Sequence, residues 1–285
     1  MTGGRPDAEG VADAGTVAHV ERSAYVRYGA RVLACGVDLA ALVESVRAVG
    51  DWADGFRVEF RSLVEDSGLR QRPSIIAVAD AMGEARPDLH DPSSRLLLVE
   101  QREEVWLGEI LAEPDRSYDL HDEKPHRTSA SLPSRLARAL VNLAGADVAR
   151  VVDPCCGTGS ILLEACRVGI AAVGADRNKR MAGMSKKNLE HFAYEAAVSH
   201  CDSADLACAA DAVVTDLPYG RNLEADPANI ASILQACAGM APVGVFAAGE
   251  DITGGLVEAG YATVALYRVR KYNAFTRFIH LAKKA

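Results

Sequence analysis

A glycine-containing turn in this chain has the residue types needed to bind a nucleotide-like ligand. The apolar segment 151–152 leads into Asp153-Pro-Cys-Cys-Gly-Thr-Gly, which places Gly157 and Gly159 one residue apart. Glycine has no Cβ, so the backbone at such a turn can pass close to a ligand. Asp153 closes the apolar segment, where its carboxylate could order the loop or meet a cationic group of the ligand.

Two further aspartates follow the next predicted strands. Asp176 ends one strand, where an acidic residue suits hydrogen bonds to ribose hydroxyls. Asp202 follows the next and could accept a hydrogen bond from an adenine amino group. The nicotinamide fingerprint GxGxxG would need glycine where Leu162 stands, so S-adenosylmethionine is favoured over a dinucleotide. The predicted cofactor-binding residues are Asp153, Cys156, Gly157, Thr158, Gly159, Asp176, Asp202, Ser203 and Asp216.

A second motif, Asp216-Leu-Pro-Tyr, closes a later strand and could act on an exocyclic amine. Such an amine is a poor nucleophile, because its lone pair is delocalised into the ring. Asp216 and a carbonyl of the Leu217–Pro218 turn could accept its two N–H groups, and Tyr219 could stack on the base. The predicted catalytic residues are therefore Asp216, Pro218 and Tyr219, and neither a metal nor a covalent intermediate is required.

Alternating strands and helices must position these residues. After Arg150, helices are predicted at 160–168, 179–192, 228–240 and 252–259, and strands at 151–153, 171–176, 197–201, 212–216, 244–248, 262–270 and 276–282. Alternation of this kind predicts a parallel sheet with helices on both faces. The turn between the last two strands cannot hold a crossover helix, so that pair is expected to be antiparallel. The predicted fold class is α/β, a Rossmann-like seven-stranded sheet with an antiparallel last strand.

The first part of the chain predicts a small α+β module. Its predicted order is strand, helix, strand, helix and two strands, at 30–35, 39–49, 56–60, 73–82, 96–100 and 105–111. Leucines at helical spacing from Leu132 to Leu143 predict a further helix that leads into the alternating part. The predicted division is a disordered leader at 1–20, the module at 21–114, a polar linker at 115–130 and the α/β domain at 131–285.

Composition narrows the classes of function. The net charge of −8 is uneven, since residues 1–120 carry −9 and residues 121–285 carry +1. Phosphate neutralisation supplies much of nucleic-acid affinity, so the acidic front argues against such a substrate. The stretch after Glu258 argues for one, because it is basic, contains interleaved aromatic residues and has no acidic residue.

The cysteines and the apolar segments indicate in which cellular compartment the protein is expected. The seven cysteines form no CxxC pair, which favours reduced thiols in a cytoplasmic protein and no zinc site. No apolar run approaches the roughly 18 residues of a membrane span, and the N-terminus lacks the pattern of a signal peptide. We therefore expect no membrane association.

These motifs resemble a known family. Asp153–Gly159 and Asp216–Gly220 are similar to the first and fourth motifs of amino-group methyltransferases that use S-adenosylmethionine. The segment 124–145 and the stretch Asn273-Ala-Phe-Thr-Arg277 resemble parts of the THUMP-containing RNA guanine-N2 methyltransferases. The family's motif is Asp-Pro-Pro-Tyr, and Leu217 here replaces its first proline.

The resemblance implies methyl transfer from S-adenosylmethionine to N2 of a guanosine in RNA, with tRNA the expected substrate. It also implies that the module at 21–114 is a THUMP-like RNA-binding domain. Three alternatives stay open at this point. The same amine-binding motif could act on rRNA or adenine N6 in DNA, it could act on a protein glutamine, or the chain could be a catalytically quiet RNA-binding protein.

Overall fold

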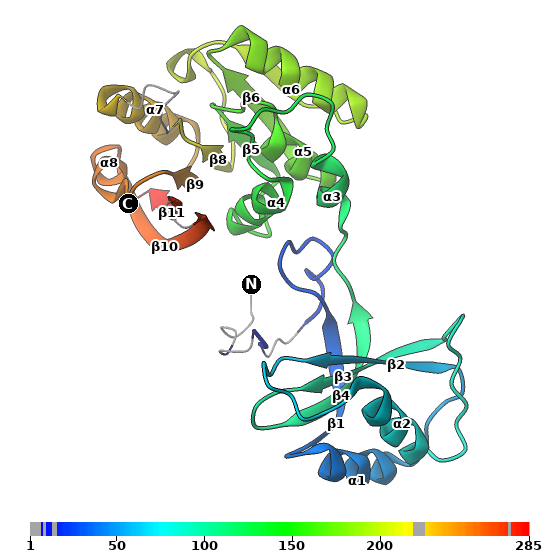
Figure 1. Ribbon diagram of the computed structural model, residues 1–285. Helices are drawn as coiled ribbons and strands as arrows, with labels where there is room; N and C mark the ends of the chain where they lie inside the picture. Colours follow the sequence, from blue (N-terminus) through cyan, green and yellow to red (C-terminus); the bar gives the residue numbers. More distant parts are fainter. Residues whose placement is uncertain (1–6, 8–9, 13–15, 219–225, 273–274, 285) are drawn as a thin grey trace. The chain divides into compact units, whose positions relative to one another are not determined.

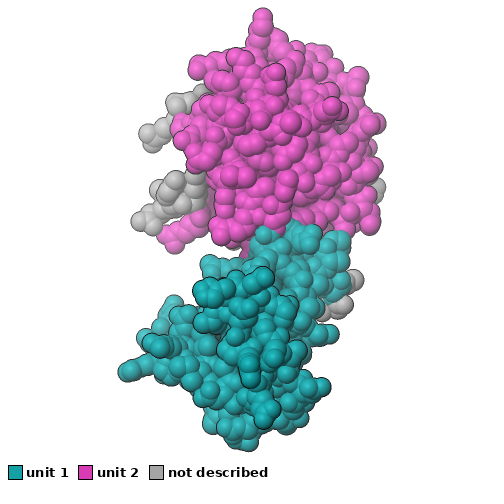
Figure 2. All heavy atoms as spheres, turned by 90° about the vertical axis from the view of Figure 1, so that its right-hand side faces the viewer, with its two compact units in different colours: residues 1–21, 26–114 teal, residues 22–25, 115–285 magenta. Residues whose placement is uncertain are grey.

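The computed structural model describes residues 7, 10–12, 16–218, 226–272 and 275–284, and for residues 271 and 272 it describes the backbone only. Within these ranges the chain forms two compact units (Figures 1 and 2). Unit 1 comprises residues 1–21 and 26–114, and unit 2 comprises residues 22–25 and 115–285. Most of the predicted leader, including residues 1–6, 8–9 and 13–15, lies outside the described residues.

Unit 1 is a four-stranded sheet with the order β1-β4-β3-β2, in which β2 and β3 are parallel and the other pairs are antiparallel. Leu42 and Val46 of α1 and Val78 of α2 are fully buried in its core against Leu98 and Leu107 of the sheet. The element order is the predicted one. Its elements are β1 (Gly29–Gly36), α1 (Leu39–Val49), β2 (Phe56–Ser62), α2 (Gln71–Ala81), β3 (Ser94–Glu100) and β4 (Val105–Ala112).

Unit 2 contains a seven-stranded sheet with the order β10-β11-β9-β8-β5-β6-β7 (Figure 1). Its first five strands are parallel, and β11 pairs antiparallel with both β9 and β10, so the predicted fold class is confirmed. The strands are β5 (Arg150–Asp153), β6 (Ala171–Asp176), β7 (Ala197–His200), β8 (Ala212–Asp216), β9 (Val243–Ala248), β10 (Tyr261–Tyr272) and β11 (Phe275–Lys284).

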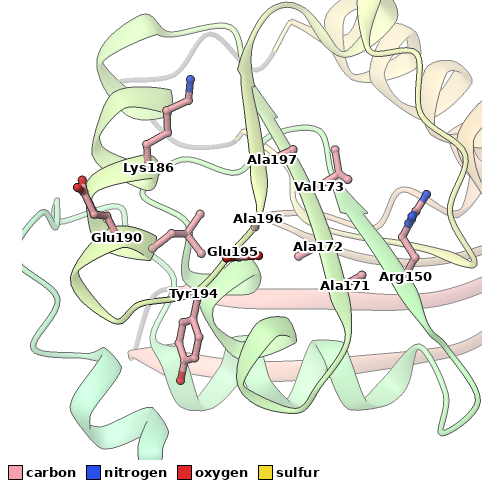
Figure 3. A pocket seen from close by; sticks show the side chains of 11 residues that line it. Arg150, Ala171, Ala172, Val173, Lys186, Glu190, Tyr194, Glu195, Ala196 and Ala197 are labelled. Atoms are coloured by element: carbon pink, nitrogen blue, oxygen red, sulfur yellow. The ribbon is translucent and has the colours of Figure 1, made fainter.

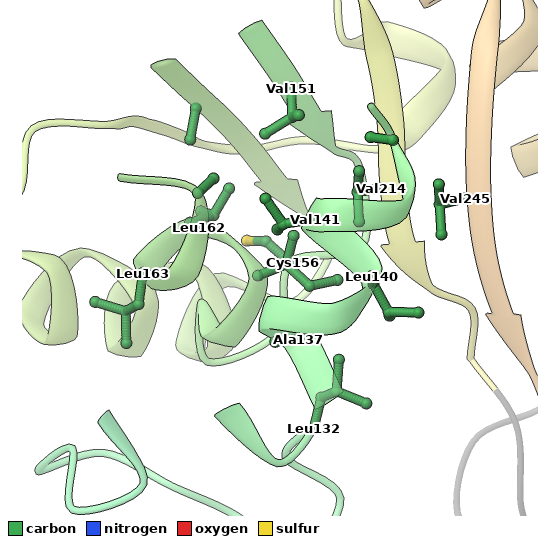
Figure 4. Packing of buried hydrophobic residues seen from close by; sticks show 14 of the residues in the cluster. Leu132, Ala137, Leu140, Val141, Val151, Cys156, Leu162, Leu163, Val214 and Val245 are labelled. Carbon is green, nitrogen blue, oxygen red and sulfur yellow. The ribbon is translucent and has the colours of Figure 1, made fainter. Parts of the chain in front are cut away.

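Helices cover both faces of this sheet, because successive strand residues point to opposite sides. On one face, Ala212 and Val214 of β8 pack against residues of three helices, and Figure 4 shows this for Val214 with Leu140 and Leu162. On the other face, Val213 and Phe246 pack in one cluster with Leu234 and Leu256, which belong to two later helices. The helices are α4 (Ser134–Leu143), α5 (Ser160–Arg167) and α6 (Lys179–His191) on one face, with α7 (Pro227–Met240) and α8 (Thr253–Glu258) on the other.

The segment predicted as a linker contains a short helix. It contains α3 (Ser117–His121), and it belongs to unit 2. The reason is a buried ionic network. Glu164 on α5 accepts from His121 and from Arg138 at 2.6 Å each, and Arg138 also donates to Ser117 at 3.0 Å. These hydrogen bonds tie the buried side chains of Ser117 and His121 to α4 and α5, which fixes α3 against unit 2.

Candidate functional site

The glycine turn between β5 and α5 has an open face. Gly157 and Gly159 have φ values of 54° and 86°, in the left-handed region where residues with a Cβ are strained. A Cβ on Gly157 would meet no heavy atom within 4 Å, whereas one on Gly159 would lie 2.5 Å from Ser185 Oγ. Gly159 is therefore required by its packing against α6, and Gly157 leaves space where a ligand can approach the backbone.

Asp153 orders this loop from within the protein. Its Oδ1 accepts from Thr215 Oγ1 at 2.7 Å and from the backbone N–H of Cys155 at 3.1 Å. The residue is 2 % exposed. Burial raises the pKa of Asp153 to about 7, and the nearby charges of Asp216 and Asp176 act in the same direction. Of the two roles expected for this carboxylate, the geometry favours ordering of the loop.

Asp176 connects the end of β6 to the same turn. Its Oδ2 accepts from the N–H of Gly157 at 2.9 Å, and its Oδ1 accepts from the N–H of Asn178 at 2.8 Å. Burial raises the pKa of Asp176, while these two hydrogen bonds act against the rise. The carboxylate that was predicted to bind a ribose thus fixes the position of the glycine turn.

The segment that precedes α4 packs directly on the loop. Ser131 Oγ lies 3.0 Å from Thr158 Oγ1, and Thr158 is 4 % exposed. Asn188 on α6 is fully buried, and its Nδ2 donates to the carbonyls of His126 and Thr158 at 2.7 and 2.8 Å. The loop is therefore held from three elements before any ligand arrives.

The other predicted cofactor residues lie around this edge of the sheet. Asp202 is exposed, lies two residues beyond the end of β7 and caps a short 3-10 helix, η1 (Ser203–Asp205), by accepting from the N–H of Ala204 at 3.1 Å. Ser203 is buried and donates to Asp202 at 3.2 Å. Cys156 is buried, and burial raises the pKa of its thiol well above the ordinary value, so it stays neutral.

The predicted catalytic motif continues β8. Asp216 pairs in register with Ala247 of β9, and the N–H of Leu217 donates to the carbonyl of Ala247 at 2.9 Å. A proline at position 217 could not make this hydrogen bond, because it has no N–H. Pro218 follows and is half-buried, and Tyr219 lies outside the described residues.

A buried arginine that was not among the predicted site residues lies next to Asp216. Arg277 Nε on β11 is 3.7 Å from Asp216 Oδ1, and the two side chains are 4 % and 17 % exposed. Arg277 is the last residue of the stretch Asn273–Arg277, which resembles the family, but no role for it follows from the sequence alone. Its distance from Asp216 depends on how β11 is inserted beside β9, which composition and spacing do not reveal.

A wide hollow of about 700 Å³ lies elsewhere in unit 2. Figure 3 shows its lining, which includes Arg150, Lys186, Glu190 and Tyr194 together with the first residues of β6. Strands β5 and β6 begin at this hollow, whereas Asp153 and Asp176 end them. The hollow is therefore at the opposite end of the strands from the site residues and takes no part in the site.

None of the described helices is both long and apolar enough to cross a membrane. Among the described residues, no group of three or more His, Cys, Asp or Glu side chains could hold a metal ion.

A family of known proteins matches the part of unit 2 that carries the site residues. Residues 122–242 match the UPF0020 family, described as an RMKL-like methyltransferase domain. This match includes the glycine turn, Asp176, Asp202 and the Asp216 motif, and it ends at the start of β9.

One curated relative and two solved structures give the wider context. A tRNA (guanine(10)-N2)-dimethyltransferase of Methanothermobacter thermautotrophicus is 33 % identical over 60 % of this chain, which spans only 54 % of that relative. The crystal structure of TrmN from Thermus thermophilus has a TM-score of 0.57 at 19 % identity, covering 96 % of this chain and 88 % of TrmN. A putative methyltransferase, SMU.472, complexed with SAH has a TM-score of 0.51 at 15 % identity, covering 93 % and 85 %. The two structures share the fold of this chain.

Proposed function

We propose that this chain transfers a methyl group from S-adenosylmethionine to the exocyclic N2 amine of a guanosine in tRNA. The observation that carries the proposal is the meeting of two motifs at one edge of the sheet. Adjacent strands β5 and β8 end at Asp153 and Asp216, and the hydrogen bond from Thr215 to Asp153 joins them. The proposal also draws on the match of residues 122–242 to a methyltransferase domain and on the name of the curated relative.

The residues of the glycine turn fit the cofactor. The space above Gly157 allows close approach to backbone atoms, and Asp176 already accepts from the N–H of that glycine. Asp202 is exposed beyond the next strand, where its carboxylate could accept from an adenine amino group. When bound, S-adenosylmethionine supplies an electrophilic methyl group on a sulfonium.

In the proposed reaction, the protein holds the nucleophilic amine. Asp216 accepts one N–H of the amine, and a carbonyl of the Leu217–Pro218 turn accepts the other. These acceptors favour the tetrahedral nitrogen that forms as the methyl group arrives, and they compensate for the positive charge that develops there. The new N–C bond would replace the bond between the methyl group and the donor's sulfur, which would leave as a neutral thioether, and the nitrogen would give up one proton to Asp216 and then to water. The Leu217 hydrogen bond to Ala247 fixes the turn, so the acceptors need little reorganisation. Tyr219 is proposed to stack on the base.

RNA binding by unit 1 is a separate part of the proposal. The predicted THUMP-like role draws on the resemblance and on the four-stranded α+β fold. Several arginines of unit 1 are neutralised by glutamates of the same unit, including the pairs Arg31–Glu109 and Arg47–Glu44. We therefore propose that unit 1 recognises RNA through shape and local contacts more than through net charge.

A cytoplasmic location is proposed too, because all seven cysteines are free thiols.

The test is incubation of the full chain with labelled methyl donor and, in turn, total tRNA, bulk rRNA, DNA and protein extract. We expect label in tRNA and N2-methylguanosine after nuclease digestion. Asp216→Ala should lower turnover by at least about 10²–10³-fold, as for loss of one positioned hydrogen-bonding group, while calorimetry still detects cofactor binding.

Asp211→Asn is the matched control, because Asp211 lies just before the other end of β8, where it accepts from the N–H groups of Ala149 and Arg150. Turnover in this variant should stay near that of the wild type. Label in rRNA, DNA or protein but not in tRNA would reject the proposed substrate. Tight cofactor binding without any label would support a catalytically quiet protein.

A further inference from the structure

The register of three strands directs Arg277 toward Asp216. Asp216 on β8 pairs with Ala247 on β9, and Ala247 pairs with Ile279 on β11. Arg277 is two residues from Ile279, so it lies on the same face of the sheet. The partner of Phe278 is Ala248, the last residue of β9. The side chain of Arg277 therefore passes the end of β9 and reaches the end of β8.

The burial of Arg277 requires a compensating charge. Its side chain is only 4 % exposed, and a guanidinium removed from water is costly unless it is paired. Asp216 Oδ1 lies 3.7 Å from Arg277 Nε, and the Arg277 guanidinium carbon is 6.0 Å from the centre of the Phe275 ring. Phe275 is two residues earlier on β11, so ring and guanidinium share a face. Both contacts restrict the orientations open to the arginine.

The local charge also needs this cation. Asp153 ends β5, which pairs with β8, and Asp176 ends β6 on the far side of β5. The charges of Asp216 and Asp176 both disfavour ionisation of Asp153. Three carboxylates at one edge of a sheet repel one another when all are ionised. Arg277 is a permanent positive charge, since a guanidinium does not lose its proton in proteins.

We propose that Arg277 is a positioning residue for the methyl transfer, which pairs with the Asp216 carboxylate and holds it oriented toward the incoming amine. This inference rests on the proposed function and extends it to a residue outside both motifs. Arg277 acts through Asp216 and makes no contact with the methyl donor. The alternative is that Arg277 and Asp216 form an ion pair that stabilises β8 and β11 but has no effect on the reaction.

A kinetic double-mutant cycle separates these readings. The variants are Arg277→Met, Arg277→Lys, Asp216→Asn and the double variant Arg277→Met/Asp216→Asn, each measured with labelled donor and tRNA. The control is Lys283→Met, which removes a positive charge from the other end of β11, where Lys283 pairs with the first residue of β9. Thermal unfolding and calorimetric cofactor binding identify any variant that is misfolded.

We expect Arg277→Met to lower kcat about 100-fold, the order of a misplacement by 1 Å, with the KM for tRNA and the cofactor Kd unchanged. Arg277→Lys should recover part of this loss, because it keeps the charge but not the planar fork. In the Asp216→Asn background, Arg277→Met should cause little further loss, and Lys283→Met should behave as wild type.

Two results would overturn the positioning role. One is a wild-type kcat in folded Arg277→Met, and the other is losses that multiply in the double variant, which would mean that Arg277 acts independently of Asp216. If the wild-type chain methylates no tRNA at all, the proposed function fails first and the role of Arg277 fails with it. Activity of the wild type therefore distinguishes the two failures.

Discussion

The buried carboxylate of Asp153 makes a prediction about stability and pH. Its pKa is about 7 in the folded protein, whereas its ordinary value is 3.8. Between these values the folded protein keeps a proton that the unfolded chain has released. The contribution of the Asp153 carboxyl to the free energy of unfolding is thus fully present below pH 3.8 and is lost as pH rises toward 7. Each pH unit in this window lowers the free energy of unfolding by up to about 1.4 kcal/mol, so about 4 kcal/mol is lost by pH 8.

Asp153→Asn removes this titration while it keeps the local geometry. The amide Oδ1 of asparagine can still accept from Thr215 Oγ1 and from the N–H of Cys155, as Asp153 Oδ1 does in the wild type. At pH 8 the variant should be more stable than the wild type by up to about 4 kcal/mol. Near pH 4 the two should differ little, because both side chains are then neutral.

The assay is urea unfolding at several pH values between 4 and 8, without added cofactor. Far-UV circular dichroism follows both units, whereas tryptophan fluorescence follows unit 1 only, because both tryptophans, Trp52 and Trp106, lie there. The fluorescence transition should be the same in the two proteins and serves as the internal control. A difference in unfolding free energy that does not change with pH would refute the reasoning.

The glycine turn and the ionic network give three further predictions. Gly157→Ala should lower the free energy of unfolding by about 1–2 kcal/mol, because its backbone is left-handed, and the unfolding temperature by a few degrees. It should also weaken cofactor binding at least about tenfold in calorimetry. Unchanged affinity would place the cofactor elsewhere. Gly159→Ala should destabilise unit 2 more than Gly157→Ala does, because its Cβ would lie 2.5 Å from Ser185 Oγ, and equal unfolding temperatures would contradict this. Glu164→Leu should cost about 3–5 kcal/mol, since it leaves the buried charge of Arg138 uncompensated; a loss below about 1 kcal/mol in urea unfolding would show that the pair is not needed.

Local patterns determined much of the fold. The helical period of leucines predicts α4, and the strict alternation after Arg150 predicts the parallel sheet, because both periodicities follow from which side chains must be buried. The positions of Asp153, Asp176 and Asp216 at strand ends also follow from the sequence, since apolar runs end where these acids stand. Carboxyl ends of parallel strands share one edge of a sheet, which brings the three acids together without further information.

Other features required the tertiary structure. The sequence predicts a polar linker at residues 115–130, because nothing local shows that His121 of this segment is buried and contacts Glu164 on a distant helix, which also pairs with Arg138 of α4. From the sequence, Leu217 is only a departure from the family motif. The structure shows that its N–H donates a hydrogen bond to Ala247 of β9, which a proline could not do. The contact of Arg277 with Asp216 depends on inserting β11 antiparallel beside β9. Each of these depends on partners far apart in the chain, and only packing decides which distant charges and backbone groups meet.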